Sequence, residues 1–160
     1  MNLFVKNIGT ERAFTKIGRY CSYQERCHSE VRQELFSYGL YPDEVNEIIV
    51  KLIAENYLNE QRFAVAFAGG RFRLKKWGRV KIKYELRKRM ISDACISKAL
   101  YSLDEEAYKT TLNQLFQLKE KAVSKEKNLL KRKMKIKAWL LQKGYERELI
   151  TDLFKNGSQI

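Results

Sequence analysis

Apolar residues recur along this chain at helical spacing. Leucine, isoleucine and valine positions fall three and four residues apart, and no stretch keeps the strict alternation that a half-buried strand requires. Glycine and proline, the residues that most often interrupt helices, are scarce, with eight and one respectively. The pattern therefore predicts an all-α protein.

A weak internal repeat with a period of about 50 residues organises this pattern. Its first stripe holds two apolar residues four apart and a third position four further on. The three copies read Val31-x3-Leu35-x3-Gly39, Ile82-x3-Leu86-x3-Met90 and Ile136-x3-Leu140-x3-Gly144. A second apolar stripe follows in register, at Val45, Ile48 and Ile49, at Ile96, Ala99 and Leu100, and at Ile150, Leu153 and Phe154. Each copy is therefore expected to carry two amphipathic helices.

Start and stop signals divide these helices in the same way. Gly39 and Gly144 fall where a left-handed residue would end a helix, and Pro42 suits the first position of the next helix. Gly78 occupies the N-cap position of the second copy, whereas Met90 stands where a glycine would end the corresponding helix.

A further helical stretch precedes each pair. These stretches are expected at roughly 11 to 21, at 60 to 76 after the N-cap Asn59, and at 104 to 124 after a capping box, Ser102-x-x-Glu105. Together, these stretches and the helix pairs predict three tandem three-helix repeats, at 11–58, 59–103 and 104–157, after an N-terminal extension at 1–10. Repeats of this length usually stack on their neighbours, so we expect an elongated, curved body with one long concave surface.

The chain is strongly basic, with a formal net charge of +13 and a pI near 9.7. Such a charge indicates a polyanionic partner, either nucleic acid or an anionic membrane surface. No run approaches the roughly 18 apolar residues that a membrane-spanning helix needs, and the first six residues hold no long apolar segment. We therefore expect a cytoplasmic protein.

Two segments concentrate the positive charge. Residues 71–89 hold ten basic side chains and one acid, and residues 119–137 hold nine basic side chains and two acids. Phe72 and Trp77 interleave with the bases of the first segment, a composition that can combine phosphate contacts with base stacking. From the sequence, the two aromatic rings either stack on bases or pack into the core, and the lysines either bind a polyanion or only solvate a helix face.

Catalytic and metal-binding patterns are missing from the sequence. Cys21, Cys27 and Cys95 form no CxxC pair, and the single histidine, His28, directly follows Cys27. A zinc site needs about four ligands, and neighbours on a helix point in different directions, so we expect free thiols rather than a metal or Cys–His site. No Walker-type loop or HExxH motif occurs either. The chain is expected to need no cofactor and to catalyse no reaction.

Three spaced motifs resemble the signature of the RecX family. The most specific is Tyr57-Leu58-Asn59-Glu60-Gln61-Arg62-Phe63-Ala64, which is similar to the Tyr-Leu-Asp/Asn-acid-x-Arg-Phe-Ala motif at the junction of that family's first and second repeats. The upstream motif is Arg26-Cys27-x-x-Glu30-Val31, and the downstream motif is Trp77-Gly78-Arg79-x-Lys81-Ile82-x-x-Glu85-Leu86. Cys27 and Met90 depart from the family's Ser and Gly, and the third repeat matches only through its apolar spacing and Lys143-Gly144-Tyr145. The likeness covers residues 13 to 155.

The resemblance implies a regulator that catalyses nothing itself. A protein of this family would lodge in the groove of the RecA filament on single-stranded DNA, and would modulate, most simply inhibit, the recombinase, ATPase and co-protease activities of RecA in DNA repair and the SOS response. Binding to bare single-stranded DNA would be weak and non-specific, and the protein would act as a monomer.

The binding surface is expected on the second repeat, where the first basic segment lies. The predicted RecA- and DNA-binding patch is Arg62, Arg71, Arg73, Lys75, Lys76, Trp77, Arg79, Lys81, Lys83, Arg87, Lys88 and Arg89, and a secondary basic patch is Lys125, Lys127, Lys131, Arg132, Lys133 and Lys135. Arg62 is either a contact or a structural residue, and Phe63 is expected in the core. Joint replacement of Arg73, Lys76, Arg79 and Lys83 by Ala is expected to leave the fold intact.

Two other functions are compatible with the charge. A stand-alone DNA-binding protein could use helix-turn-helix or Myb-like repeats, but the third helices expected at 42–55, 93–101 and 146–155 are acidic or mixed and fit DNA poorly. A scaffold that binds ribosomal RNA or an anionic membrane is also compatible with the net charge alone.

Overall fold

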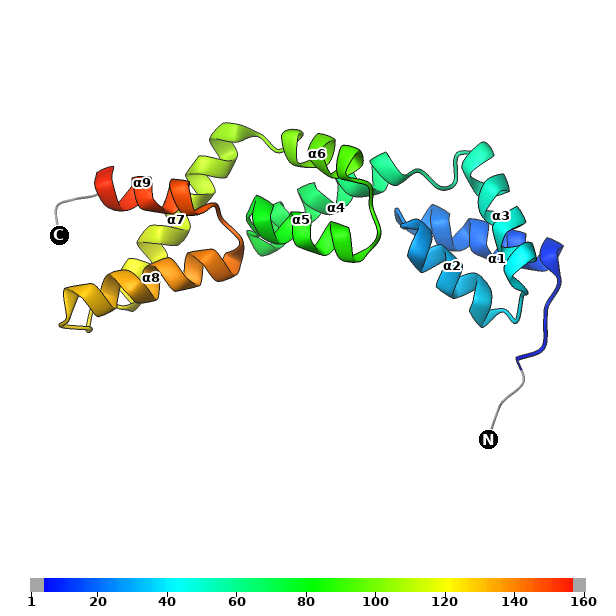
Figure 1. Ribbon diagram of the computed structural model, residues 1–160, viewed down its shortest axis with the longest axis horizontal. Coiled ribbons are helices and arrows are strands. Elements are labelled where there is room, and N and C mark those ends of the chain that lie inside the picture. The colour runs from blue at the N-terminus through cyan, green and yellow to red at the C-terminus, as the bar shows by residue number, and fades with distance from the viewer. Residues whose placement is uncertain (1–4, 157–160) are drawn as a thin grey trace.

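The computed structural model describes residues 5–156, and this range contains nine helices and no strand (Figure 1). Module 1 consists of α1 (Thr10–Tyr23), α2 (His28–Ser37) and α3 (Pro42–Ala54). Module 2 consists of α4 (Glu60–Lys75), α5 (Arg79–Lys88) and α6 (Asp93–Tyr101), and module 3 of α7 (Glu105–Ala122), α8 (Leu129–Lys143) and α9 (Arg147–Asn156). The modules follow one another along the long axis of the molecule (Figure 1). The prediction of an all-α, elongated three-repeat protein is confirmed.

The repeat register predicted from the apolar spacing is confirmed by burial and by backbone conformation. The six apolar residues of the first stripes are almost completely buried, from Val31 at 0% exposure to Ile136 at 2%. The third position of each copy adopts a positive φ, which is 80° at Gly39, 61° at Met90 and 95° at Gly144. Met90 therefore takes the left-handed conformation that glycine accommodates without steric cost.

Most of the predicted helix starts are also confirmed. Asn59 caps α4 by accepting the Arg62 backbone N–H at 2.8 Å, Pro42 is the first residue of α3, and Gly78 is the N-cap of α5.

The predicted Ser102-x-x-Glu105 capping box is wrong. Ser102 keeps helical backbone angles as the C-cap of α6, and its hydroxyl donates to the Ala99 carbonyl. The N-cap of α7 is Asp104, whose extended backbone lets its side chain accept the Ala107 N–H at 2.7 Å. Ser102 thus belongs to the last turn of α6 and does not cap α7.

The buried apolar residues form two separate clusters. One lies within module 1 and includes Ile17, Leu35 and Leu52. The other is shared by modules 2 and 3, runs from Phe63 to Ile150, and takes Cys27 from module 1. The expected stacking of each repeat on its neighbour is thus extensive between modules 2 and 3, whereas module 1 contributes one residue to the shared core. No helix in the described part of the chain is long and apolar enough to cross a membrane.

Candidate functional site

The corner between α4 and α5 carries the first basic segment. Helix α4 ends at Lys75, Lys76 turns the chain with a left-handed φ of 56°, and Gly78 starts α5. The Lys76 backbone N–H donates to the Phe72 carbonyl at 3.0 Å, which closes the last turn of α4. The turn brings the adjoining ends of the two helices together, with Trp77 at the corner.

Three cations of the predicted patch gather around Trp77. The charged groups of Arg71, Lys75 and Lys81 lie 5.3, 5.5 and 4.6 Å from the centroid of its ring. Trp77 itself is half-buried and packs against the core shared by modules 2 and 3. Cations within about 6 Å of an aromatic ring are attracted by its electron-rich face, so these side chains are held together despite their like charge.

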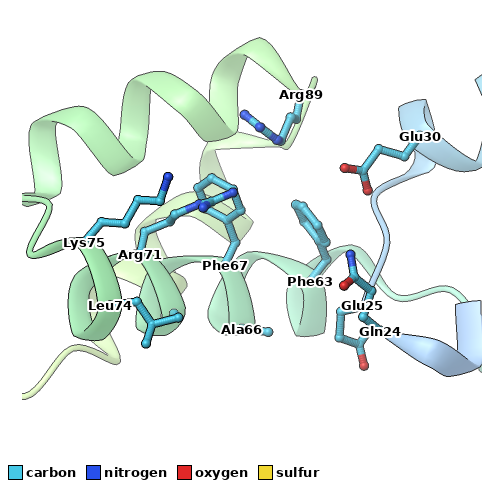
Figure 2. Close-up of a pocket in the computed structure, with 11 residues that line it drawn as sticks. Gln24, Glu25, Glu30, Phe63, Ala66, Phe67, Arg71, Leu74, Lys75 and Arg89 are labelled. Carbon is cyan, nitrogen blue, oxygen red and sulfur yellow. The ribbon is translucent and has the colours of Figure 1, made fainter.

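The same arrangement continues towards module 1 through Phe67. The guanidinium carbons of Arg71 and Arg89 lie 4.9 and 4.8 Å from the centroid of the Phe67 ring, and Figure 2 shows both side chains beside it. Arg89, Phe67, Arg71, Trp77 and Lys81 therefore form a continuous line of alternating cations and aromatic rings. We call these five residues the cation–aromatic row.

The row carries a net positive charge. Arg89 is the paired member, because its Nη1 donates to Glu85 Oε2 at 2.8 Å, a bond that lowers the pKa of Glu85. Within residues 5–156, Arg71, Lys75 and Lys81 have no ion pair with a carboxylate. These cations can therefore interact with an external anion without first breaking a salt bridge.

The remaining predicted residues of module 2 divide into free and paired cations. Arg73, Lys76 and Lys83 are exposed. Arg87 pairs with Asp93 at 3.1 Å, and Lys88 approaches Glu85 at 3.7 Å. These three cations have no ion pair within the described residues, whereas the pairs at the end of α5 partly neutralise that end.

Arg79 departs from its expected place on a solvated face. Its guanidinium pairs with Glu105 and Glu146 of module 3 and lies 3.9 Å from the Tyr108 ring centroid, and its side chain is 22% exposed. Burial alone would lower the pKa of Arg79, but the hydrogen bonds to the two glutamates outweigh burial and raise it. Arg79 therefore joins modules 2 and 3, and it is not the exposed, unpartnered residue on which the expectation of an intact fold after joint replacement rested.

Arg62 also has structural partners. Its Nε donates to Glu25 of module 1 at 2.6 Å, and its other nitrogens donate to the side chain and carbonyl of Asn56 at 3.1 Å. These bonds tie the start of α4 to module 1 and to the connection after α3. Phe63 beside it is 5% exposed, which confirms the prediction that it is a core residue.

The two aromatic residues of the first basic segment have different environments. Phe72 is buried with its ring centroid 5.6 Å from that of Tyr108, so it cannot stack on an external base. Trp77 packs against the core and against cations but is only half-buried. Of these two aromatic residues, Trp77 is therefore the one that retains contact with solvent.

The secondary basic patch lies on the connection between α7 and α8 and on the first half of α8. Lys125, Lys127, Lys131 and Lys133 are exposed. Arg132 instead donates to the carbonyls of Ser124 and Glu126, at 2.7 and 3.0 Å, and Lys135 pairs with Glu126 at 2.9 Å. Five of its six members are thus exposed to solvent, because Lys135 stays exposed in its ion pair and only Arg132 is half-buried.

Sequence reasoning missed four residues that form cation–aromatic contacts, namely Phe67 in module 2 and Lys119, Trp139 and Lys143 in module 3. Phe67 follows Phe63 by four positions and precedes Arg71 by four, so helical spacing could have placed it in line with Arg71. In module 3, Lys119 and Lys143 lie 5.4 and 5.5 Å from the Trp139 ring centroid. No local signal joins Lys119 to Trp139, because they lie on different helices, α7 and α8.

The three cysteines are free thiols in the structure. Burial raises the pKa of Cys21 and of Cys27, which keeps both thiols protonated. In the part of the chain that the structure describes, no group of three or more His, Cys, Asp and Glu side chains is arranged to hold a metal ion.

Comparisons with known proteins agree with the sequence motifs. The family model described as "RecX, second three-helix domain" matches residues 59–100. The "Regulatory protein RecX" of Bacillus cereus strain B4264 is 29% identical over 145 residues, which cover 90% of this chain and 53% of that protein. The protein of the same name from Bacillus thuringiensis strain Al Hakam is 27% identical over the same shares. The chain thus spans about half the length of the curated relatives it matches.

Solved structures show the same fold. The crystal structure of RecX from Lactobacillus salivarius superposes with a TM-score of 0.80 and 25% identity, covering 94% of this chain and 97% of that one. A second structure, of "regulatory protein RecX", gives a TM-score of 0.82 at 20% identity and covers 92% of this chain and 71% of that one. From the motifs, the module architecture and these matches together, the chain is similar to proteins of the RecX family in sequence and in fold.

Proposed function

We propose that this protein regulates RecA by binding the RecA filament on single-stranded DNA, and that module 2 supplies the main contact surface. The observation that carries the proposal is the position of the cation–aromatic row. All five of its residues lie within the segment 59–100 that matches the second three-helix domain of the RecX family.

The chemistry of the row suits a filament that presents both protein and a polyanionic strand. Arg71 and Lys81 of the row, and Lys75 beside Trp77, can neutralise phosphates and release their counterions, which gives binding without sequence preference. Half-buried aromatic rings and guanidinium planes add surfaces on which unstacked bases can lie. The exposed lysines at the start of α8 add a second basic surface on module 3.

Such a protein acts by occupying the RecA filament rather than by catalysing a reaction. It acts in the cytoplasm as a monomer and without a cofactor, binds bare single-stranded DNA weakly, and inhibits the recombinase, ATPase and co-protease activities of RecA. Inhibition then requires protein in proportion to filament rather than in catalytic amounts.

The test is inhibition of RecA ATP hydrolysis on single-stranded DNA by a charge-depleted variant. Arg73, Lys75, Lys76 and Lys83 are exposed and have no ion pair within the described residues, so their joint replacement by Ala removes charge without breaking a salt bridge. The concentration for half inhibition should rise about ten-fold or more, because contacts to phosphates are lost.

A matched control removes four exposed cations outside module 2, namely Lys6, Arg12, Arg19 and Arg147. It should inhibit RecA like the wild type. If the two quadruple variants remain folded by circular dichroism and inhibit RecA equally, module 2 is not the contact surface. Co-sedimentation with single-stranded DNA, with and without RecA, separates this function from stand-alone DNA binding. Equal retention in both conditions would contradict a role at the filament.

A further inference from the structure

A cavity of about 340 Å³ lies at the junction of modules 1 and 2 (Figure 2). Its volume is at the small end of the range of about 300 to 1,000 Å³ that is typical of ligand pockets. Helix α4 supplies an apolar surface from Phe63, Phe67 and Leu74, and Leu74 is 85% exposed although it belongs to the lining. The cavity therefore combines an apolar wall with access from solvent.

The two ends of the cavity carry opposite charge. Figure 2 shows Arg71 and Lys75 at one end and Glu30, Glu25 and Gln24 of module 1 at the other. Arg71 and Lys75 have no ion pair within residues 5–156. A ligand that fits this cavity would therefore be anionic at one end and carry hydrogen-bond donors at the other.

The acidic end retains the capacity to accept further hydrogen bonds. Glu30 Oε2 accepts the Cys27 backbone N–H at 3.1 Å, and Glu25 Oε1 accepts from Arg62 at 2.6 Å. A carboxylate offers about four acceptor sites, so one bond to each leaves others for a ligand. Between the two ends, Arg89 lies over Phe67 and is itself neutralised by Glu85, so its guanidinium provides a planar surface rather than a free charge.

We propose that this cavity binds one nucleotide of single-stranded DNA whose base carries an exocyclic amino group, cytosine or adenine. The phosphate binds to Arg71 and Lys75, the base stacks in the region of Phe67 and Arg89, and the amino group donates to Glu30. Bases in single strands commonly stack on aromatic rings and guanidinium planes. Thymine offers only a carbonyl where cytosine and adenine carry the amino group, so it would face the carboxylate with an acceptor.

The inference rests on the proposed function only in that it takes single-stranded DNA as the ligand. It adds a subsite and a base preference to a surface that would otherwise bind without sequence preference. The nucleotide contacts both modules, so binding would also hold module 1 against module 2.

The first experiment measures base preference by fluorescence anisotropy, with labelled dC and dT oligonucleotides of equal length and without RecA. The wild type should bind the dC oligonucleotide about ten-fold more tightly, since one discriminating base contact is worth about that much or more. Glu30→Gln should abolish the preference while keeping the cap of α2, because Gln also accepts the N-cap amide in a capping box. Equal affinity of the wild type for both oligonucleotides would overturn the proposal.

The second experiment separates the cavity from general basicity. Arg71→Ala with Lys75→Ala removes two charges from the cavity, and Lys125→Ala with Lys127→Ala removes two exposed charges from the secondary basic patch. The cavity variant should lose more affinity for the dC oligonucleotide than the matched variant, and Phe67→Leu should weaken binding without a change of charge. If the two double variants lose affinity equally and Phe67→Leu binds like the wild type, the cavity is not a nucleotide site.

The outcomes also distinguish this inference from the proposed function. Base preference is measured without RecA, so its absence leaves inhibition of RecA untouched. Conversely, a protein that shows the preference but fails to inhibit RecA would contradict the proposed function and keep the nucleotide site.

Discussion

A Cβ atom on Gly78 would collide with the backbone carbonyl of Gly144, the residue that ends α8. The two backbones meet directly at this crossing, where the Gly78 N–H donates to the Lys143 carbonyl and the Val80 N–H donates to the Gly144 carbonyl, each at 2.9 Å. Gly144 is equally confined, because a Cβ there would collide with Lys81. At this crossing modules 2 and 3 therefore contact each other backbone to backbone.

Replacement of Gly78 by Ala should lower the free energy of unfolding by about 1 to 3 kcal/mol, the usual cost of forcing extra atoms into a packed site. Gly70→Ala is the matched control, because Gly70 lies within α4 and a Cβ there would meet no atom within 4 Å. The control should gain about 0.5 to 1 kcal/mol, since glycine weakens a helix interior. Urea denaturation measures both, and equal stabilities would contradict the close crossing.

Met90→Gly should stabilise the protein by about 1 kcal/mol. Residue 90 has a left-handed φ of 61°, a conformation that costs a residue with a Cβ atom about that much and that glycine adopts freely. Met90 is 82% exposed, so little packing is lost with its side chain. Met134→Gly, at a 62% exposed position inside α8, should instead destabilise by about 1 kcal/mol. Thermal denaturation of both variants checks the opposite signs.

Arg79→Ala should cost about 1.5 to 3 kcal/mol, the range for hydrogen bonds to charged groups, because Glu105 and Glu146 lose their partner. Arg73→Ala removes the same type of side chain from an exposed position of α4 and should change stability by about 0.5 kcal/mol or less. Chemical denaturation distinguishes them. A similar small effect for both would mean that Arg79 does not hold modules 2 and 3 together.

Alkaline pH should destabilise the junction of modules 2 and 3 through Tyr108. Burial, and then the hydrogen bond that its hydroxyl donates to Glu146 at 2.6 Å, raise the pKa of Tyr108 above its ordinary value. A group whose pKa is raised on folding binds its proton more tightly in the native state. Its contribution is therefore fully present below the unfolded-state pKa of about 10 and is lost as pH rises from there through the folded pKa.

The measurement is the free energy of unfolding between pH 8 and pH 11 for the wild type and for Tyr108→Phe. The variant should be less stable at pH 8, because the hydroxyl also accepts the Arg79 backbone N–H at 2.9 Å. It should lose less stability than the wild type as pH rises. Parallel curves for the two proteins would show that Tyr108 does not contribute to the alkaline transition.

The amino-acid sequence determined the helices and the register of the three repeats. Side chains three and four residues apart share one face of a helix, so the spacing of Val31 and Leu35 or of Ile82 and Leu86 is enough to place a buried stripe. The left-handed positions follow from the same register, which is how Met90 could be recognised as the counterpart of Gly39 and Gly144. The predicted N-cap of α7 is wrong by two residues, because Ser102 and Asp104 both suit an N-cap and the end of α6 decides between them.

Only the tertiary structure decided which cations are free and which are structural. Arg73 and Arg79 look alike in the sequence, yet Arg79 meets Glu146, which lies 67 residues further along the chain, and Arg62 meets Glu25, which lies 37 residues earlier. Likewise, the line from Arg89 through Phe67 and Arg71 to Trp77 needs α4 and α5 to pack side by side. Local spacing specifies the face of a helix on which a residue lies, but a partner on another helix depends on how the modules pack, and that packing is set by the shared core and by the crossing at Gly78 and Gly144.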